Sequence, residues 1–171
     1  MRMSPPFCIR RFRRDDQLAV ERLVLTIQRD EFGVALSADN QPDLRDIAAF
    51  FSHPNSAFWV AEARQTPSII GCIGLEALPG NLAAMRKFMV HLDWRGKATG
   101  VAASLNATFE ASAQNNSITK IVLSTVDVTK AAQRFYQNIG YSGVQISELP
   151  EAFVPGVIDT LFYVKTVANK V

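Results

Sequence analysis

The sequence predicts an α/β fold in which helices pack against a mixed sheet, and two features carry this prediction. Three apolar segments, 57–63, 68–78 and 82–90, follow one another with only short turns between them. Connections that short join antiparallel strands, so these segments are expected to form a meander. A helical segment at 101–114 then leads to another strand at 118–125, and this strand–helix–strand succession predicts a parallel pair.

The residues before the meander are predicted to form a strand, at 7–12, and two helices. Asp15 and Asp16 offer side-chain acceptors that can cap the first helix. Its apolar face comprises Val20, Leu23, Val24 and Ile27. This helix is expected to end at Gly33, where glycine permits a left-handed backbone. A second helix is expected to start near Pro42, with a buried face that comprises Leu44, Ile47, Ala48 and Phe51.

After the parallel pair, a helix is predicted at 129–139, followed by closing strands at 141–147 and 160–166. The whole order is strand, two helices, three-strand meander, helix, strand, helix and two strands. The sequence shows no internal repeat and no long linker. A chain of 171 residues, 48% of them apolar, suits one domain with an ample core. The prediction is therefore a single domain over 1–171, with its core at about 7–167.

Charge and cysteine usage exclude several classes of protein. The net charge is only +2, and the one basic cluster, Arg10 to Arg14, is interpreted as a solvated strand edge, so no nucleic-acid partner is expected. No apolar run approaches about 18 residues, and residues 1–6 show no hydrophobic signal segment, so no membrane association is expected. Cys8 and Cys72 form no metal-binding or disulfide pattern. The expectation is a cytoplasmic protein without a metal.

The loop after the third meander strand combines glycines and cations at the start of a helix. Free N–H groups and a partial positive charge at a helix N-terminus attract phosphate. Arg95 and Lys97 add charge, and Gly96 and Gly100 allow close backbone approach. The loop is neither a Walker A sequence, because Ala98 follows Gly96-Lys97, nor a GxGxxG fingerprint, because the glycine spacing differs. A merely solvated loop is the alternative.

This loop resembles motif A of the GNAT acyl-CoA-dependent N-acyltransferases, Arg/Gln-x-x-Gly-x-Gly/Ala. Arg95 and Gly100 match its first and last positions, and Ala98 stands where a glycine is usual. The order of predicted elements also resembles that family over nearly the whole chain.

A second segment, 129–141, resembles motif B of the same family, Asn-x-x-Ala-x-x-x-Tyr-x-x-x-Gly-Phe. The matched positions are Thr129, Ala132, Tyr136, Gly140 and Tyr141, with Thr129 in place of Asn and Tyr141 in place of Phe. Two motifs in the expected order are more specific than either one alone.

The resemblance implies acetyl-CoA as co-substrate, held where the strand before the loop splays from its parallel neighbour. The backbone of Phe88, Met89 and Val90 would pair with the pantetheine arm like an added strand. The pyrophosphate would lie on the loop and helix start, namely Arg95, Gly96, Lys97, Ala98, Thr99, Gly100 and Val101. The Ala98 methyl would crowd it if that position required a positive φ. Thr129 either contacts the CoA arm or serves only as a helix cap.

The resemblance makes Tyr136 both a cofactor contact and the candidate general acid, protonating the CoA thiolate as it leaves. The alternative is that Tyr136 is only a core aromatic of its helix. No acid stands at 82–85, where many relatives carry the general base, so Glu76 is the nearest candidate. Glu62 and a water chain are alternatives, and Glu76 is otherwise a solvent-facing strand residue.

On the acceptor side, the resemblance points to the end of the first helix. Gln28, Asp30 and Glu31 are expected to line the acceptor site, where the two acids would attract a cationic amine; a solvated helix end is the alternative. The segment 148–155 either closes this site or lies at a homodimer contact. The predicted activity is acetyl transfer from acetyl-CoA to a small-molecule or peptide primary amine by direct attack. The alternative is an acyl-CoA-binding sensor without turnover.

Overall fold

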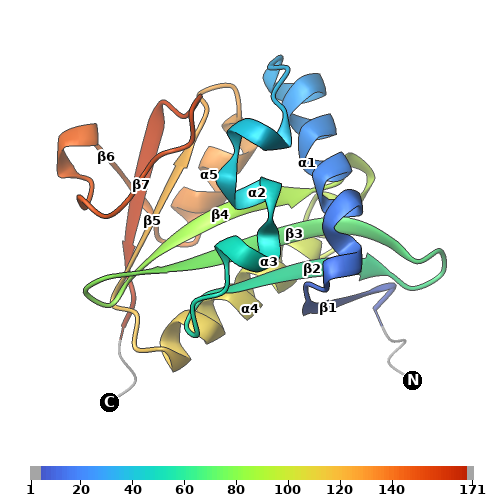
Figure 1. Ribbon diagram of the computed structural model, residues 1–171, viewed down its shortest axis with the longest axis horizontal. Coiled ribbons are helices and arrows are strands. Elements are labelled where there is room, and N and C mark those ends of the chain that lie inside the picture. The colour runs from blue at the N-terminus through green and yellow to red at the C-terminus, as the bar shows by residue number, and fades with distance from the viewer. Residues whose placement is uncertain (1–4, 169–171) are drawn as a thin grey trace.

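One mixed sheet organises the protein (Figure 1), and the computed structural model describes it over residues 5–168. The described residues do not include 1–4 or 169–171. The prediction that residues 1–6 contain no hydrophobic signal segment therefore lies mostly outside them. The strand order is β1-β2-β3-β4-β5-β7-β6. The strands are β1 (Phe7–Arg11), β2 (Ala57–Ala63), β3 (Ser68–Leu78), β4 (Leu82–Val90), β5 (Lys120–Thr125), β6 (Ser142–Val144) and β7 (Leu161–Thr166).

The strand pairing confirms the predicted meander and the parallel pair. Strands β2, β3 and β4 pair antiparallel in sequence order, β1 joins the β2 edge, and β4 pairs parallel with β5. The parallel ladder is short, because it joins only 82–84 to 120–122. The rest of β4 has no strand partner on its β5 side, so the two strands splay as the family resemblance implied.

A β-bulge in β4 accompanies this separation. The register between β3 and β4 shifts between Cys72 and Gly74, where β4 contains one residue more than β3. Lys87, within the extra step, has a φ of 47°, which is unusual for a residue other than glycine. The Cys72 thiol donates a hydrogen bond to the Lys87 carbonyl, with Sγ 3.1 Å from the oxygen. A bulge bends and twists its strand, which leads the end of β4 away from β5.

Helices cover both faces of the sheet (Figure 1). On one face, α1 (Gln17–Phe32), α2 (Pro42–Arg45) and α3 (Ile47–Phe50) bury a core with β2 and β3. On the other, α4 (Val101–Asn115) and α5 (Lys130–Asn138) share the second core, which includes the fully buried Phe109. Within residues 5–168, no helix has both the length and the apolar character that crossing a membrane demands.

Two helix predictions were wrong in detail. The helix expected after Pro42 is two four-residue helices, because Asp46 adopts φ −143° and ψ 88° and its side chain accepts a hydrogen bond from the Ala49 N–H. This local bond offers the backbone an alternative to a continuous helix. Asp16 does not cap α1 either, because its carboxylate accepts hydrogen bonds from the Arg10 guanidinium and the Arg13 N–H instead.

The predicted ends of other elements differ less. Gly33 ends α1 with φ 67°, which confirms the left-handed exit. The strand expected at 141–147 is confined to Ser142–Val144, because the chain turns into a 3-10 helix at Ile146–Glu148.

Replacement of Gly74 with alanine is expected to destabilise the fold by about 1–3 kcal/mol, the usual cost of overpacking a core. A Cβ at this position would lie 2.6 Å from the Phe51 Cζ and 2.9 Å from the Phe58 Cδ2. Gly143→Ala is the matched control, since the nearest atom to its Cβ is 3.9 Å away, on the Tyr163 ring. Chemical denaturation measures both variants, and equal midpoints would contradict this packing.

Candidate active site

A cavity of about 800 Å³ lies where β4 and β5 separate. Its wall includes every residue of β4 from Met85 to Val90, the end of β5, and parts of α1 and α5. The segment 154–159, which precedes β7, closes another side. Within the segment 148–155, which was expected either to close the acceptor site or to form a dimer contact, Val154 and Pro155 line the cavity.

The splayed half of β4 supplies the expected backbone edge. Phe88, Met89 and Val90 all line the cavity. Because parallel pairing stops at Ala84, the backbone groups beyond it that face β5 have no partner strand. Unpaired N–H and C=O groups on an extended strand are a template for one more extended chain, such as a pantetheine arm.

The loop after β4 is held open by its own side-chain and backbone geometry. Gly96 and Gly100 have φ values of 95° and 73°, and Gly100 immediately precedes α4. The Thr99 hydroxyl lies 2.6 Å from the Trp94 carbonyl and 3.0 Å from that of Gly96, donating toward both. Ala98 does not have a positive φ, so the condition under which its methyl would crowd a pyrophosphate is not met. The first N–H groups of α4 remain available to an anion.

Of the loop residues predicted to hold the cofactor, only two line the cavity. Arg95 and Gly96 belong to its wall. The remainder do not line it, although Ala102 directly after them does; they are Lys97, Ala98, Thr99, Gly100 and Val101.

Arg95 joins three elements of the site. Its Nε donates to the Val90 carbonyl at 2.8 Å, and its two Nη atoms pair with both carboxylate oxygens of Glu31 at the end of α1. Glu31 lines the cavity, and Arg95 neutralises its charge. Asp30 does not line the cavity; it lies exposed and pairs with Arg29.

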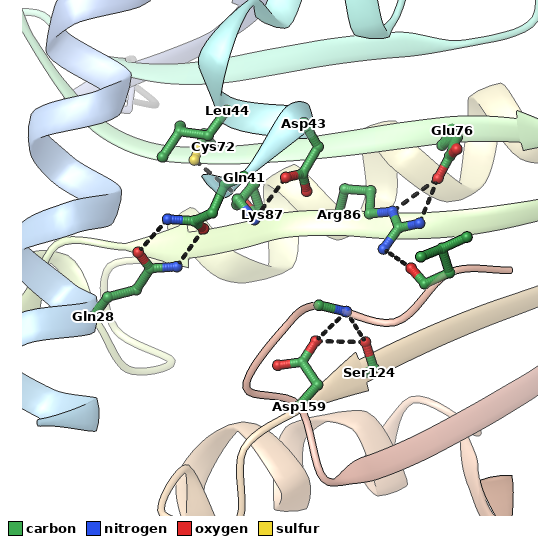
Figure 2. A network of polar contacts seen from close by, with 12 residues as sticks. Gln28, Gln41, Asp43, Leu44, Cys72, Glu76, Arg86, Lys87, Ser124 and Asp159 are labelled. Atoms are coloured by element: carbon green, nitrogen blue, oxygen red, sulfur yellow. Dashed lines mark hydrogen bonds and ion pairs between the residues drawn. The ribbon is translucent and has the colours of Figure 1, made fainter. Parts of the chain in front are cut away.

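Gln28 is buried and contributes to the cavity wall. It exchanges reciprocal hydrogen bonds with Gln41 at 2.8 and 2.9 Å (Figure 2). A buried amide pair of this kind fixes the loop after α1 against the helix.

Tyr136 lies in α5, is buried in the core and also lines the cavity. The rings of Phe88, Tyr141 and Tyr163 surround it, with centroids 5.9–6.3 Å away. Burial raises the pKa of the Tyr136 phenol, and the negative charge of Asp159 raises it further. Both effects keep the phenol protonated at neutral pH, which is the form that a general acid requires. Tyr136 is thus a core aromatic that also lines the cavity.

Glu76, the candidate base, lines the cavity but is held in an ion pair. Its Oε2 accepts a hydrogen bond from the Arg86 Nε at 2.8 Å and lies 2.8 Å from Nη2 in the ion pair. Arg86 also donates to the Val154 carbonyl (Figure 2). Glu62, the alternative base, pairs with Arg10 and does not line the cavity.

Two polar groups in the cavity wall were missed in the sequence. Lys87 and Asp43 form a largely buried ion pair with Nζ 3.0 Å from Oδ1. Asp159 accepts hydrogen bonds from the Ser124 hydroxyl at 2.5 Å and the Gly156 N–H at 3.1 Å. Both arrangements join segments far apart in the chain, and neither follows a short motif.

The signature of the acetyltransferase (GNAT) family matches residues 22–141, which is more than half of the chain. The chain belongs to the GNAT family. It is 31% identical over 121 residues to N-acetylaspartate synthetase of Xenopus tropicalis, covering 70% of this chain and 42% of that protein. It is 32% identical over 119 residues to probable N-acetyltransferase 14 of the same organism, covering 70% and 57%. The chain thus spans about half the length of these curated relatives.

Solved structures agree with the GNAT assignment. A GNAT acetyltransferase from Staphylococcus aureus Mu50 has a TM-score of 0.89 and 28% identity, covering 95% of this chain and 99% of that one. N-acetylglutamate synthase from Neisseria gonorrhoeae, solved with coenzyme A and N-acetyl-glutamate, has a TM-score of 0.73 over 98% of this chain and 36% of that one. At 14% identity, the second likeness concerns the fold alone.

Thr129, the motif B residue that replaces the usual GNAT asparagine, does not cap α5 through its side chain. Its hydroxyl donates to the Val126 carbonyl at 2.7 Å and lies 3.1 Å from the Thr125 hydroxyl. It also lines the cavity, so the alternative of a plain side-chain cap does not hold. Among residues 5–168, no cluster of three His, Cys, Asp or Glu side chains could hold a metal ion.

The two cysteines of this GNAT domain are expected to differ sharply toward a thiol reagent. Burial raises the pKa of the Cys72 thiol to about 12, so between pH 7 and 9 almost no thiolate forms, and only thiolate reacts. Cys8 is partly exposed. One thiol should therefore react in the native protein and the second only after unfolding, with none in native Cys8→Ser. Rapid native reaction of two thiols would contradict the burial of Cys72 beneath the bulge.

Proposed function

We propose that this GNAT domain transfers the acetyl group of acetyl-CoA to the primary amine of a small molecule by direct attack. The observation that carries the proposal is the cavity between the splayed strands, where a free β4 edge and the Tyr136 phenol share one wall. An N-acetyltransferase needs both a slot for the acyl carrier and a proton donor for the departing thiol.

The residues present fit acetyl-CoA. The unpaired β4 edge at 85–90 would hold the pantetheine arm, and Gly96, Gly100 and the first turn of α4 would receive the pyrophosphate. Lys97 in this loop is exposed and adds a positive charge. When bound, acetyl-CoA would supply an acyl group activated as a thioester.

The acceptor would occupy the side of the cavity formed by α1, the loop after it and the segment 154–159. A cavity of about 800 Å³ is in the range of small-molecule sites. The name of one similar protein, N-acetylaspartate synthetase, also favours a small amine. Arg95, paired with Glu31, would set the boundary between the acceptor side and the loop 91–100, which would receive the pyrophosphate and is named the phosphate loop.

Tyr136 would act as the general acid. Its raised pKa keeps the proton on the phenol until a thiolate develops within reach. Ring packing on Phe88 and Tyr163 fixes the phenol, so the proton is delivered from a constant position.

Acetyl-CoA is expected to raise the melting temperature of the protein. At 100 times its Kd, a ligand that binds only the folded state stabilises it by about 2.7 kcal/mol. For a domain of this size that is a shift of about 5–10 °C, at about 2–4 °C per kcal/mol. A thermal-shift titration measures it, and no shift at millimolar acetyl-CoA would contradict the proposed co-substrate.

Tyr136→Phe is expected to lower kcat for acetyl transfer by about 100-fold or more while leaving the acetyl-CoA thermal shift unchanged, since only the proton donor is lost. Thiol release over a panel of primary amines provides the assay. Tyr163→Phe is the matched control, because Tyr163 is an equally buried neighbour that does not line the cavity. Equal kcat in the two variants would show that Tyr136 is only a core residue and not the general acid. Thermal stabilisation without thiol release from any amine would favour a sensor.

A further inference from the structure

Four carboxylates line the cavity, and three of them are neutralised by a cation. Glu31 pairs with Arg95. Asp43 and Glu76 pair with consecutive residues of β4, Lys87 and Arg86 respectively (Figure 2). The fourth carboxylate, Asp159, has no cationic partner among residues 5–168.

Asp159 is held in place by neutral donors only. Its Oδ2 accepts both the Ser124 hydroxyl, at 2.5 Å, and the Gly156 N–H, at 3.1 Å. The other oxygen, Oδ1, accepts no hydrogen bond from any described residue. A half-buried carboxylate with an unused oxygen carries a full charge that a cationic ligand can satisfy.

The carboxylate lies on the β5 side of the splay. Ser124, its partner, stands two residues beyond Val122, where the parallel ladder ends. Figure 2 shows Ser124 and Asp159 together there, with the Glu76–Arg86 and Asp43–Lys87 pairs on the β4 side. Tyr136, whose phenol pKa is raised by burial and by the charge of Asp159, lines the same cavity.

We propose that Asp159 binds the acceptor ammonium through Oδ1 and takes its proton, which makes it the general base of the reaction. This inference rests on the proposed acetyl transfer. Glu76, the base suggested by its strand position, would instead hold Arg86 against the 154–159 segment through the Arg86–Val154 hydrogen bond.

The proton balance of the step is complete. Asp159 takes one proton from the ammonium, which frees the nitrogen lone pair, and then passes that proton to solvent. The nitrogen–carbon bond then forms, and the carbon–sulfur bond breaks with its electron pair on sulfur. Tyr136 protonates that sulfur, and the second nitrogen proton, released as the amide forms, restores the phenol. The products are the N-acetyl amine, free thiol and one proton.

The decisive variant is Asp159→Asn. Asparagine keeps the shape and still accepts hydrogen bonds from Ser124 and Gly156, but it removes the charge and the basic oxygen. Glu76→Gln is the matched control, since it alters the other candidate base. The probes are benzylamine, which is protonated at neutral pH, and aniline, which is already the free base, each within a panel of similar alkylamines and arylamines.

With alkylamines, Asp159→Asn is expected to lower kcat/KM at neutral pH by about 100-fold or more, the usual contribution of a general base. With arylamines, which need no deprotonation, the loss should be about fivefold or less. The alkylamine defect should also shrink as pH rises toward the pKa of the amine. The other ionisable side chains around the cavity are the same in the wild-type protein and in Asp159→Asn; they are Glu31, Asp43, Glu76, Arg86, Lys87, Arg95, Lys130 and Tyr136.

The outcomes separate this inference from the proposed function. Equal losses with alkylamines and arylamines would show a merely structural role for Asp159 and overturn the inference. Full activity of Asp159→Asn together with a large loss in Glu76→Gln would assign the base to Glu76. Absence of a thermal shift with acetyl-CoA in the wild-type protein would instead overturn the proposed function itself. Stabilisation by acetyl-CoA without turnover of any panel amine would overturn both catalytic proposals.

Discussion

The site depends on one constraint, which is that β4 and β5 pair over only three residues each before they part at Ala84 and Val122. Beyond these residues, the bulge at Lys87 turns β4 away from β5. This separation creates the cavity and the free β4 edge, and it lets residues of α5 line the cavity.

Three ion pairs fix the β4 side of the cavity and compensate the charges there. Lys87–Asp43 ties the bulge to α2, Arg86–Glu76 ties β4 to β3, and Arg95–Glu31 ties the phosphate loop to α1. Removing one member of a buried pair leaves the other charge buried without a partner, which is costly. These pairs therefore fix the positions of the elements that they join, even where their net contribution to stability is small. Asp159 stands apart from this arrangement, and an incoming ammonium would complete it.

Local patterns in the sequence were enough to predict the meander, the parallel pair and the motif residues around the cavity. Strand alternation, helix periodicity and motif spacing can all be recognised within short stretches of sequence. The break at Asp46 was missed since a local side-chain bond outweighed the apolar spacing that suggested one helix. The partners of Glu31 and Asp159 were missed for another reason. Arg95 lies 64 residues from Glu31 and Ser124 lies 35 residues from Asp159, and no periodicity connects residues that distant.

The most direct test of the splayed strands as the acyl-CoA slot is hydrogen exchange of backbone amides with and without acetyl-CoA. Strong new protection is expected in peptides that cover 85–101, which contain the free edge of β4 and the phosphate loop. The exchange of peptides from β1 and β2, which lie at one edge of the sheet away from the β4–β5 gap, should change little. Protection elsewhere with no change over 85–101 would contradict the proposal that acetyl-CoA binds between β4 and β5.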